Sequence, residues 1–502
     1  MATLTYPGVY VDELSSGVRT ITGVATSITA FVGRALRGPV DKATTITSYA
    51  DFERVFGGLW VDSALGYAVR DFYAHGGATA VIVRVHKTAA NDTASLSIGA
   101  NTKKITLSAS SPGAWGSKLT AKIDLDVKTV AGDATLYNLT ITDTTTGKVE
   151  VFRNVSGKTD SPRRADLVIA EESSLVVMID RPTAQPDVAA TTPFTNGNDG
   201  TAVDAALYTT GVGLRAAKKG LYALETTDLV NLIVIPPFLN GGVDATVLTN
   251  TIEYATERRA VVIVDPPATW TTVANAALPA NAVPASKNAA VYFPRLRKPD
   301  PLRDGQITTM APSGAVAGVI ARTDATRGVW KAPAGLEATL NGVAELSVPL
   351  TDLEIGQLNP LGINCLRNAP GAGHVVWGAR TREGSDRLAS EWKYLPVRRT
   401  ALFIEESLYR GTQWVVFEPN DAPLWAQIRL NVGAFMNNLF RQGAFAGATP
   451  REAYFVKCDK ETTTPDDVNL GIVNVIVGFA PLKPAEFVVV KLQQIAGQTG
   501  GA

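Results

Sequence analysis

The segment Gly478–Leu492, which reads GFAPLKPAEFVVVKL, decides how this chain can be organised. A β-prone run, Ile472–Phe479, comes before a second apolar run, Phe487–Leu492. Between the two runs, Pro481 and Pro484 favour a stiff, extended backbone, because proline lacks an N–H group and restricts the residue before it. The last strand is therefore held away from the preceding strand, and its unpaired backbone groups need a partner. That partner is either another chain or the strand's own sheet, and this segment leaves both alternatives open.

The N-terminal segment has the same character as the C-terminal one. A Pro-Gly breaker comes before a short β-prone run that ends in two carboxylates: Val9, Tyr10, Val11, Asp12 and Glu13. Ser15, Ser16 and Gly17 then read as a flexible joint. The segment lacks the charged start and apolar core of a signal peptide. A detachable strand at each end of a large globular chain predicts a subunit that exchanges strands with its neighbours.

The composition describes a large folded protein. The chain has 502 residues, of which 45% are hydrophobic and 19% charged, so it can form a sizeable core in about two to four domains. Lys+Arg and Asp+Glu balance at 47 each, which argues against a nucleic-acid binder that relies on a net basic field. Cys365 and Cys458 form neither a disulfide framework nor a metal pattern, and we expect both to be buried and reduced. No apolar run approaches the length of a membrane span.

The element pattern predicts an α/β (α+β) fold with several domains. Residues 21–88 read as strand, helix, helix and strand, in which Ser48 begins the first helix and glycine pairs end both helices. Residues 89–200 change to short alternating runs rich in Thr, Ser, Val and Asp, which predict a small, mostly antiparallel β domain inserted into the first domain. Residues 201–358 return to strand, helix and strand, as in a βαβ unit.

Residues 359–480 supply further strands and one long helix. Apolar runs predict strands at Ala401–Ile404, Trp414–Phe417, Glu452–Lys457 and Ile472–Phe479. In the helix, Asp421 is the expected cap and Pro423 suits the first turn. Its expected buried face repeats at helical spacing and consists of Trp425, Ile428, Val432, Phe435 and Leu439.

No motif in the sequence supports a catalytic or cofactor site. Gly157-Lys158-Thr159 resembles the end of a phosphate-binding loop, but Phe152 stands where that loop needs its first glycine. Gly211–Ala216 matches a dinucleotide fingerprint without a strand before it. Asp265 follows a strand, where α/β enzymes place carboxylates, yet without a partner motif it fits a loop cap better. The remaining candidates lack the spacing of metal ligands, a triad or an acid–base dyad: His75, His86, His374, Glu405, Glu406, Asp466 and Asp467. We therefore expect no enzyme activity, cofactor or metal.

Six stretches form one ordered pattern along the chain. They are Tyr6–Glu13; Thr29–Gly33 with Gly38-Pro39, Asp51-Phe52 and Phe56–Gly58; Pro312–Asp324 with Gly328–Gly335; Val376–Thr381 with Trp392–Tyr394 and Val397–Arg399; Phe417–Asp421 with Leu424-Trp425; and Gly478–Val490. In this order they resemble the contractile tail sheath proteins of bacteriophages and of phage-tail-like particles such as pyocins. Residues 89–200 carry none of the pattern, so the resemblance assigns no role to any individual residue among them.

The resemblance implies a subunit of a helical sheath that is stacked in rings around a tail tube. It implies an inner domain made of residues 21–88 and 359–480, with residues 201–358 as an inserted α/β middle domain and residues 89–200 facing outward. Residues 1–20 and 481–502 would be arms that exchange strands with neighbouring subunits. The linking residues so implied are Val9, Tyr10, Val11, Asp12, Glu13, Phe487, Val488, Val489, Val490 and Leu492. The hinge or spacer residues are Ser15, Ser16, Gly17, Pro481 and Pro484.

The same resemblance implies a mechanism and a set of partners. The sheath would assemble in an extended, high-energy state, then shorten and widen by rigid-body movement of its subunits and drive the tube through a target envelope. The helix 423–440 is the candidate tube-facing element, through Gln427, Arg429, Asn437 and Arg441; the alternative, that it only packs against its own sheet, stays open. The expected partners are other copies, the tail tube protein, and baseplate and tail terminator proteins, without direct nucleic-acid contact or membrane insertion. The expected location is the virion tail, assembled in the host bacterial cytoplasm.

Two other classes of function stay open at this point. A sheath of a tailocin, a type VI-like system or an extracellular contractile injection system would have the same fold. An α/β enzyme that uses Asp265 or the Gly211 loop is the remote alternative. Light scattering separates the enzyme from a sheath, because an enzyme gives a small fixed oligomer whereas a sheath protein gives polymers or tubes.

Overall fold

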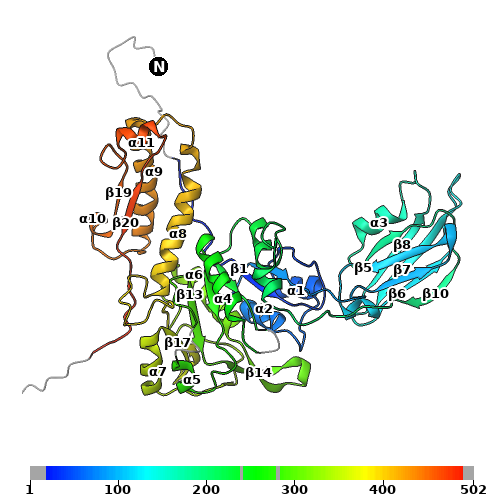
Figure 1. Ribbon diagram of the computed structural model, residues 1–502, viewed down its shortest axis with the longest axis horizontal. Helices are drawn as coiled ribbons and strands as arrows, with labels where there is room; N and C mark the ends of the chain where they lie inside the picture. The colour runs from blue at the N-terminus through cyan, green and yellow to red at the C-terminus, as the bar shows by residue number, and fades with distance from the viewer. Residues whose placement is uncertain (1–18, 238–240, 279–282, 490–502) are drawn as a thin grey trace, which may run out of the picture. The chain divides into compact units, whose positions relative to one another are not determined.

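The computed structural model describes residues 19–237, 241–278 and 283–489 of the chain. These residues form two compact units, whose elements are labelled in Figure 1. The central unit comprises Ala25–Thr326 and Pro333–Lys393, and the described part of the terminal unit comprises residues 19–24, Arg327–Ala332 and 394–489. The terminal unit therefore joins the two ends of the described chain, which are far apart in sequence.

An eight-stranded sheet forms the middle of the central unit. Its order is β18-β17-β13-β12-β11-β1-β3-β2, with six parallel inner strands and an antiparallel strand at each edge. The inner strands are short apolar runs that are buried on both faces, as parallel strands covered by helices require. The strands are β1 (Thr29–Gly33), β2 (Thr44–Ile46), β3 (Ala80–Arg84), β11 (Leu232–Val234), β12 (Val261–Val264), β13 (Ala289–Phe293), β17 (Ile363–Ala369) and β18 (Gly373–Val376).

Helices accompany this sheet. They are α1 (Tyr49–Phe56), α2 (Leu65–Ala74), α4 (Ala245–Glu257), α5 (Val273–Ala277), α6 (Ser313–Arg327) and α7 (Asp352–Leu358). Of these, α1, α4, α5 and α7 begin with a side-chain cap. As predicted, Ser48 caps α1 by accepting the N–H of Asp51, and Gly57 ends it in the left-handed conformation. Gly314 lets α6 approach α2 closely, because a Cβ at that position would lie 2.6 Å from the Cα of Ala68.

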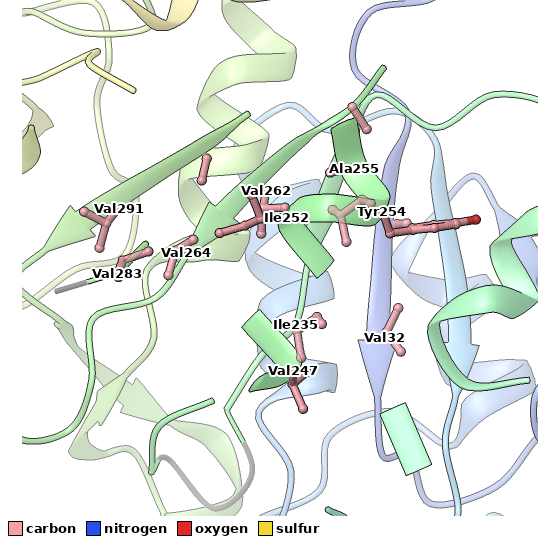
Figure 2. Packing of buried hydrophobic residues seen from close by; sticks show 14 of the residues in the cluster. Val32, Ile235, Val247, Ile252, Tyr254, Ala255, Val262, Val264, Val283 and Val291 are labelled. Carbon is pink, nitrogen blue, oxygen red and sulfur yellow. The ribbon is translucent and has the colours of Figure 1, made fainter. Parts of the chain in front are cut away.

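The main core of the central unit consists mostly of aliphatic side chains, with a few aromatic ones. Figure 2 shows side chains of the sheet packed with side chains of α4. Those labelled from the strands and nearby loops are Val32, Ile235, Val262, Val264, Val283 and Val291, and those from α4 are Val247, Ile252, Tyr254 and Ala255. This core holds the sheet as one body from β1 to β17.

The pairing of β1 joins residues 21–88 to the segment that was expected to form the middle domain. Residues 21–88 and 359–480 were expected to form one domain, but β1 pairs with β11, with Thr29 opposite Leu232. Of residues 359–480, the segments that form β17 and β18 join this sheet, and residues 394–480 lie in the other unit. The reason is that these strands are equivalent apolar runs, so their composition does not specify which of them become neighbours.

Residues 89–200 contain two antiparallel sheets that share one apolar core. The sheet orders are β10-β6-β7-β8 and β4-β5-β9. Strand β6 shows the expected alternation, since Leu119, Ala121 and Ile123 are buried and the residues between them are not. The strands are β4 (Ser95–Ile98), β5 (Ile105–Ala109), β6 (Leu119–Asp124), β7 (Leu136–Asp143), β8 (Val149–Ser156), β9 (Val176–Asp180) and β10 (Ala189–Pro193). The helix α3 (Ala165–Glu172) was not predicted.

A small antiparallel sheet of order β15-β14-β16 completes the central unit. Its strands are β14 (Leu296–Asp300), β15 (Gln306–Met310) and β16 (Glu345–Leu346). One face of β14 is buried against α2: the Nζ atom of Lys298 lies 2.5 Å from the Oδ1 atom of Asp71, and the Tyr67 hydroxyl donates to Asp300 over 2.8 Å. These two contacts fix the position of the hairpin on α2.

The terminal unit is built on two long helices. Its elements are α8 (Leu395–Gly411), α9 (Ala422–Arg441), α10 (Pro450–Ala453), β19 (Tyr454–Lys457), α11 (Pro465–Asn469) and β20 (Ile476–Phe479). Asp421 caps α9 by accepting the N–H of Leu424, with Pro423 in the first turn, as predicted. The strands predicted at Ala401–Ile404 and Trp414–Phe417 are wrong. The first lies inside α8, and the second is divided between a short 3₁₀ helix, Gln413–Val415, and the turn that follows it.

Candidate assembly surface

The hairpin β19–β20 packs one face on α9 and presents the other to solvent (Figure 1). In β19, Tyr454 and Val456 contact the core around Ile428 and Val432 of α9, whereas Phe455 is 50% exposed. This alternation follows from the period of two in a strand. The hairpin is therefore half-buried, and its outer face carries apolar surface.

Phe455 and Gly478 are opposite each other in the hairpin. A Cβ at Gly478 would lie 2.5 Å from Cζ of Phe455 and closer still to Cε1, so the aromatic ring covers the glycine on the outer face. Only glycine leaves room for the ring in this position. The match fixes the register of the two strands, because a shift by one residue would place Val477 under the ring.

The outer edges of the hairpin are open in the described part of the chain. The sheet contains β19 and β20 and no third strand among the described residues. Pairing continues past the strand ends, where Ala480 donates to Ala453 over 2.8 Å and accepts from Ala446 over 2.9 Å. A two-stranded sheet with free edges can accept further strands.

The described N-terminal residues are fixed on the two helices of the terminal unit. The Arg19 N–H donates to the side-chain oxygen of Asn431 in α9 over 3.0 Å, and the Arg19 guanidinium lies 4.5 Å from the ring centroid of Trp414. The Val24 N–H donates to Ser407 Oγ in α8 over 3.2 Å. The chain before residue 19 therefore starts from a point held by α8 and α9.

Two glycines allow this N-terminal segment to lie close to α8. A Cβ at Gly411 would be 2.5 Å from Ile21, and a Cβ at Gly23 would be 2.8 Å from the ring of Phe403. Ile21 is buried in the same core as α9. Sequence reasoning missed this anchor, although Gly23 and Gly411 were a signal of close backbone approach.

The C-terminal segment leaves the same unit after β20. Pro481 bridges to Phe445, and the Tyr394 hydroxyl donates to Glu486 Oε2 over 3.1 Å. After that bond, the predicted linking residues have no helix or strand and are exposed by 74%, 82% and 79% for Phe487, Val488 and Val489. The predicted spacer residue Pro484 is half-buried. The other predicted linking and joint residues lie outside the described residues: Val9, Tyr10, Val11, Asp12, Glu13, Ser15, Ser16, Gly17, Val490 and Leu492.

The four residues suggested for contact with a tube are not equally accessible. Gln427, Arg429 and Asn437 are partly buried, and Arg441 is exposed near the end of α9. The Arg429 guanidinium donates to the Cys458 carbonyl and so fixes the loop after β19. Burial raises the pKa of the Cys458 thiol, and Arg429 acts in the opposite direction. Arg429 therefore has a structural partner, which the sequence did not indicate.

The titratable groups singled out in the sequence have structural roles. Asp265 accepts the N–H and the hydroxyl of Ser313 over 2.8 and 2.6 Å, which caps α6 and confirms the predicted capping role. Burial raises the pKa of Asp265 to about 6, although both hydrogen bonds oppose the shift. His75 ends α2, as predicted, and His86 contacts Asp92 over 2.9 Å. Both cysteines are buried and free.

Two other kinds of site are absent from the described residues. These residues contain no group of three or more His, Cys, Asp or Glu side chains that could hold a metal ion. Among the described helices, none is both long enough and apolar enough to cross a bilayer.

Comparisons with known proteins agree with the sequence resemblance. Residues 210–382 match the phage tail sheath protein central domain, and residues 389–495 match the phage tail sheath C-terminal domain, together more than half of the chain. The tail sheath protein of Vibrio phage KVP40 is 27% identical over 157 residues, which are 31% of this chain and 22% of that protein. A putative prophage major tail sheath protein of Pseudomonas aeruginosa (strain UCBPP-PA14) is 27% identical over 183 residues, which are 35% of this chain and 44% of that protein.

The fold extends the similarity to the whole chain. The sheath of an extracellular contractile injection system, PVC, in its contracted state has a TM-score of 0.61 at 23% identity. The superposition covers 98% of this chain and 99% of that one. The curated relatives, by contrast, are matched over less than half of their lengths.

Proposed function

We propose, from the premise that this chain belongs to the contractile tail sheath proteins, that it polymerises as helical rings around a tail tube. The assembled sheath contracts and drives the tube through a target cell envelope. In this function the chain is a structural and mechanical protein, without enzyme activity.

The observation that carries the proposal is the convergence of both chain ends on one unit. The N-terminal segment leaves from Arg19 on α9, and the C-terminal segment leaves from Glu486 at the start of α8. Between these exits, the hairpin β19–β20 has outer edges without a described partner. Strands lent by neighbouring copies complete the sheet, with Val9–Glu13 and Phe487–Leu492 as the linking strands.

In the proposed mechanism, the strand links between subunits stay intact while the subunits move. The energy of contraction is stored in contacts between subunits in the extended state. Each subunit moves as rigid parts, and residues 15–17 and 481–484 absorb the change of direction. The strand links keep the sheath continuous throughout.

The outer surface of α9 is the proposed contact with the tail tube. Arg441 is exposed and Asn437 partly exposed near its C-terminal end, which supports their role in this contact. Gln427 and Arg429 contribute at the other end, with Arg429 also bonded to Cys458. Baseplate and tail terminator proteins are the proposed partners at the two ends of the sheath.

Two kinds of particle fit this function. A phage sheath acts in the virion tail, assembled in the bacterial cytoplasm, and serves genome ejection. A tailocin or extracellular injection system uses the same device without a genome, and the fold similarity to PVC supports this second candidate. Imaging of native particles for an attached capsid separates the two.

Truncation of either arm tests the proposal. Chains without residues 1–14 or without residues 486–502 should remain folded and monomeric. The first truncation keeps the Arg19 anchor, and the second removes exposed residues and the side-chain hydrogen bond from Tyr394 to Glu486. Negative-stain microscopy should show tubes from the full chain and none from either trimmed chain. Normal tubes from a trimmed chain would refute the linking role.

A further inference from the structure

Phe417 stands out on the surface of the terminal unit. Its side chain is 103% exposed and its φ angle is 70°, a backbone conformation that a bulky residue rarely adopts. The preceding Val416 is 60% exposed. A strained, fully exposed aromatic residue costs free energy in the free subunit, so it indicates a function in a complex.

Glu418 places a carboxylate next to this aromatic ring. It is exposed and makes no ion pair with any residue that the structure describes. The loop that carries both residues is held firmly, since Asn420 donates to the Ile472 carbonyl over 3.0 Å and accepts from Trp425 over 2.8 Å. Phe417 and Glu418 therefore project together from a fixed support, as a plug of one apolar and one acidic group.

The central unit contains an unfilled cavity of about 300 Å³. It lies between α2 and β15, and its lining is mixed: the apolar part includes Val61, Tyr67, Ala68 and Met310, and the polar part includes Asp300 and Thr308. Tyr67 and Met310 are residues that pack well against an aromatic ring. The cavity can therefore accept a phenylalanine side chain.

The rim of this cavity carries a cation with spare hydrogen-bonding capacity. Arg303 has a side chain that is 51% exposed and lies 3.6 Å from the Oδ2 atom of Asp300, a distance too long for a close pair. Asp300 is already occupied on its other oxygen by Tyr67 and by the Leu302 N–H, over 2.8 and 2.9 Å. Arg303 can thus bind a second carboxylate at the mouth of the cavity.

We propose that the Phe417–Glu418 plug of one copy inserts into the cavity between α2 and β15 of a second copy, with Glu418 paired to Arg303. The inference rests on the proposed function, because it describes a contact within the polymer. Plug and cavity are different surfaces of the same chain, so the contact is head-to-tail. A head-to-tail contact that does not close into a ring generates an open helical array, as a sheath requires.

The complementarity of the two surfaces selects a second copy over other occupants. An aromatic ring next to a carboxylate matches a cavity whose lining places apolar side chains beside the Arg303 guanidinium. Two other outcomes are possible: Phe417 binds the tube protein, or the cavity stays empty. The following test distinguishes both from a contact between two copies.

Site-directed cross-linking tests the contact in the assembled full-length protein. One preparation carries Glu418→Cys, the other Arg303→Cys, and the two are mixed, assembled and oxidised with diamide. The native thiols, Cys365 and Cys458, are buried and give little background. We expect covalent dimers that contain one chain of each kind, and none when either variant is treated alone. Polymers that form without mixed dimers would overturn the contact.

Charge reversal gives a second readout. Glu418→Arg or Arg303→Glu should raise the critical concentration for assembly about tenfold or more, and the double reversal should restore it to within about threefold. Phe417→Ala should act like the single reversals, whereas Val212→Ala, at another fully exposed apolar residue, is the matched control and should assemble normally. Monomers of unchanged circular dichroism and melting temperature exclude misfolding.

The outcomes separate this contact from the proposed function. If the plug variants assemble normally while the trimmed chains do not, this contact is wrong and the strand links stand. If the unmodified chain stays monomeric at every concentration, both are wrong.

Discussion

Replacement of Gly478 by alanine tests whether the hairpin β19–β20 is held in register by the ring of Phe455. The new Cβ would lie 2.5 Å from Cζ and 3.0 Å from Cδ1 of that ring. Heavy atoms do not approach so closely, and the strand backbone cannot retreat, because β20 is paired along its whole length. The ring must therefore leave the outer face.

The cost of this movement follows from the burial of Phe455. The ring is 50% exposed, so about half of an aromatic side chain's 150–250 Å², roughly 100 Å², is removed from water. At about 25 cal/mol per Å², this burial contributes about 2.5 kcal/mol. Alanine is itself about 0.5–1 kcal/mol more favourable than glycine inside a strand, and this gain offsets part of the lost burial. Gly478→Ala should therefore destabilise the hairpin by about 1–2 kcal/mol.

Hydrogen exchange followed by mass spectrometry measures this cost locally, on peptides that cover β19 and β20. Since about 1.4 kcal/mol corresponds to a factor of ten, exchange in Gly478→Ala should be about 5- to 30-fold faster. In a chain that already carries Phe455→Ala, the same glycine replacement should leave the exchange rate unchanged or lower it. The double-mutant cycle should then give a coupling energy between positions 455 and 478 of about 2 kcal/mol. An equal cost of Gly478→Ala with and without the ring would refute the reasoning.

The remaining predictions concern stability at three other places. Burial raises the pKa of Asp265 to about 6, above its value near 3.9 in the unfolded chain, so the folded state binds the extra proton. The stability of the central unit should therefore fall by about 3 kcal/mol as the pH rises from 4 to above 6, and Asp265→Asn should flatten this dependence in urea titrations at several pH values. Lys298→Met should lower the free energy of unfolding by about 3–5 kcal/mol in urea denaturation, because it leaves the buried Asp71 carboxylate without its cation. The double variant with Asp71→Leu should regain most of this stability. Asp421→Ala should cost about 1 kcal/mol and speed hydrogen exchange in the first turn of α9.

Elements with their own end signals could be predicted from the sequence. Asp421 and Pro423 mark the start of α9, and Ser48 and Gly57 mark both ends of α1, because these residues satisfy orphan backbone groups locally. Such signals act within a few residues and need no knowledge of the fold.

Long-range choices could not be predicted in the same way. The run Ala401–Ile404 reads as a strand in a short window, although Val397, Ala401, Ile404 and Leu408 repeat at helical spacing across the whole of α8. The partner of β1 is likewise undetermined, since any buried apolar strand could complete its hydrogen bonds. The exposed plug at Phe417 belongs to the ordered pattern of the family, yet its positive φ angle is visible only in the structure.

The anchors of the two arms define how force passes through a subunit of the proposed sheath. Tyr394, which holds Glu486, precedes the first residue of α8, whereas Ser407 and Gly411, which hold the N-terminal segment, lie near its end. A helix of 17 residues is about 25 Å long, so the arms are tied to opposite ends of one rod. A pull on the C-terminal arm passes through the covalent chain into β20, and the hydrogen bond from Tyr394 to Glu486 adds a weaker second connection to α8. In the proposed sheath, tension between neighbouring copies would therefore cross the exchanged strands and the terminal unit in series, so the links hold only if the strand pairing and the core around α8 and α9 both resist it.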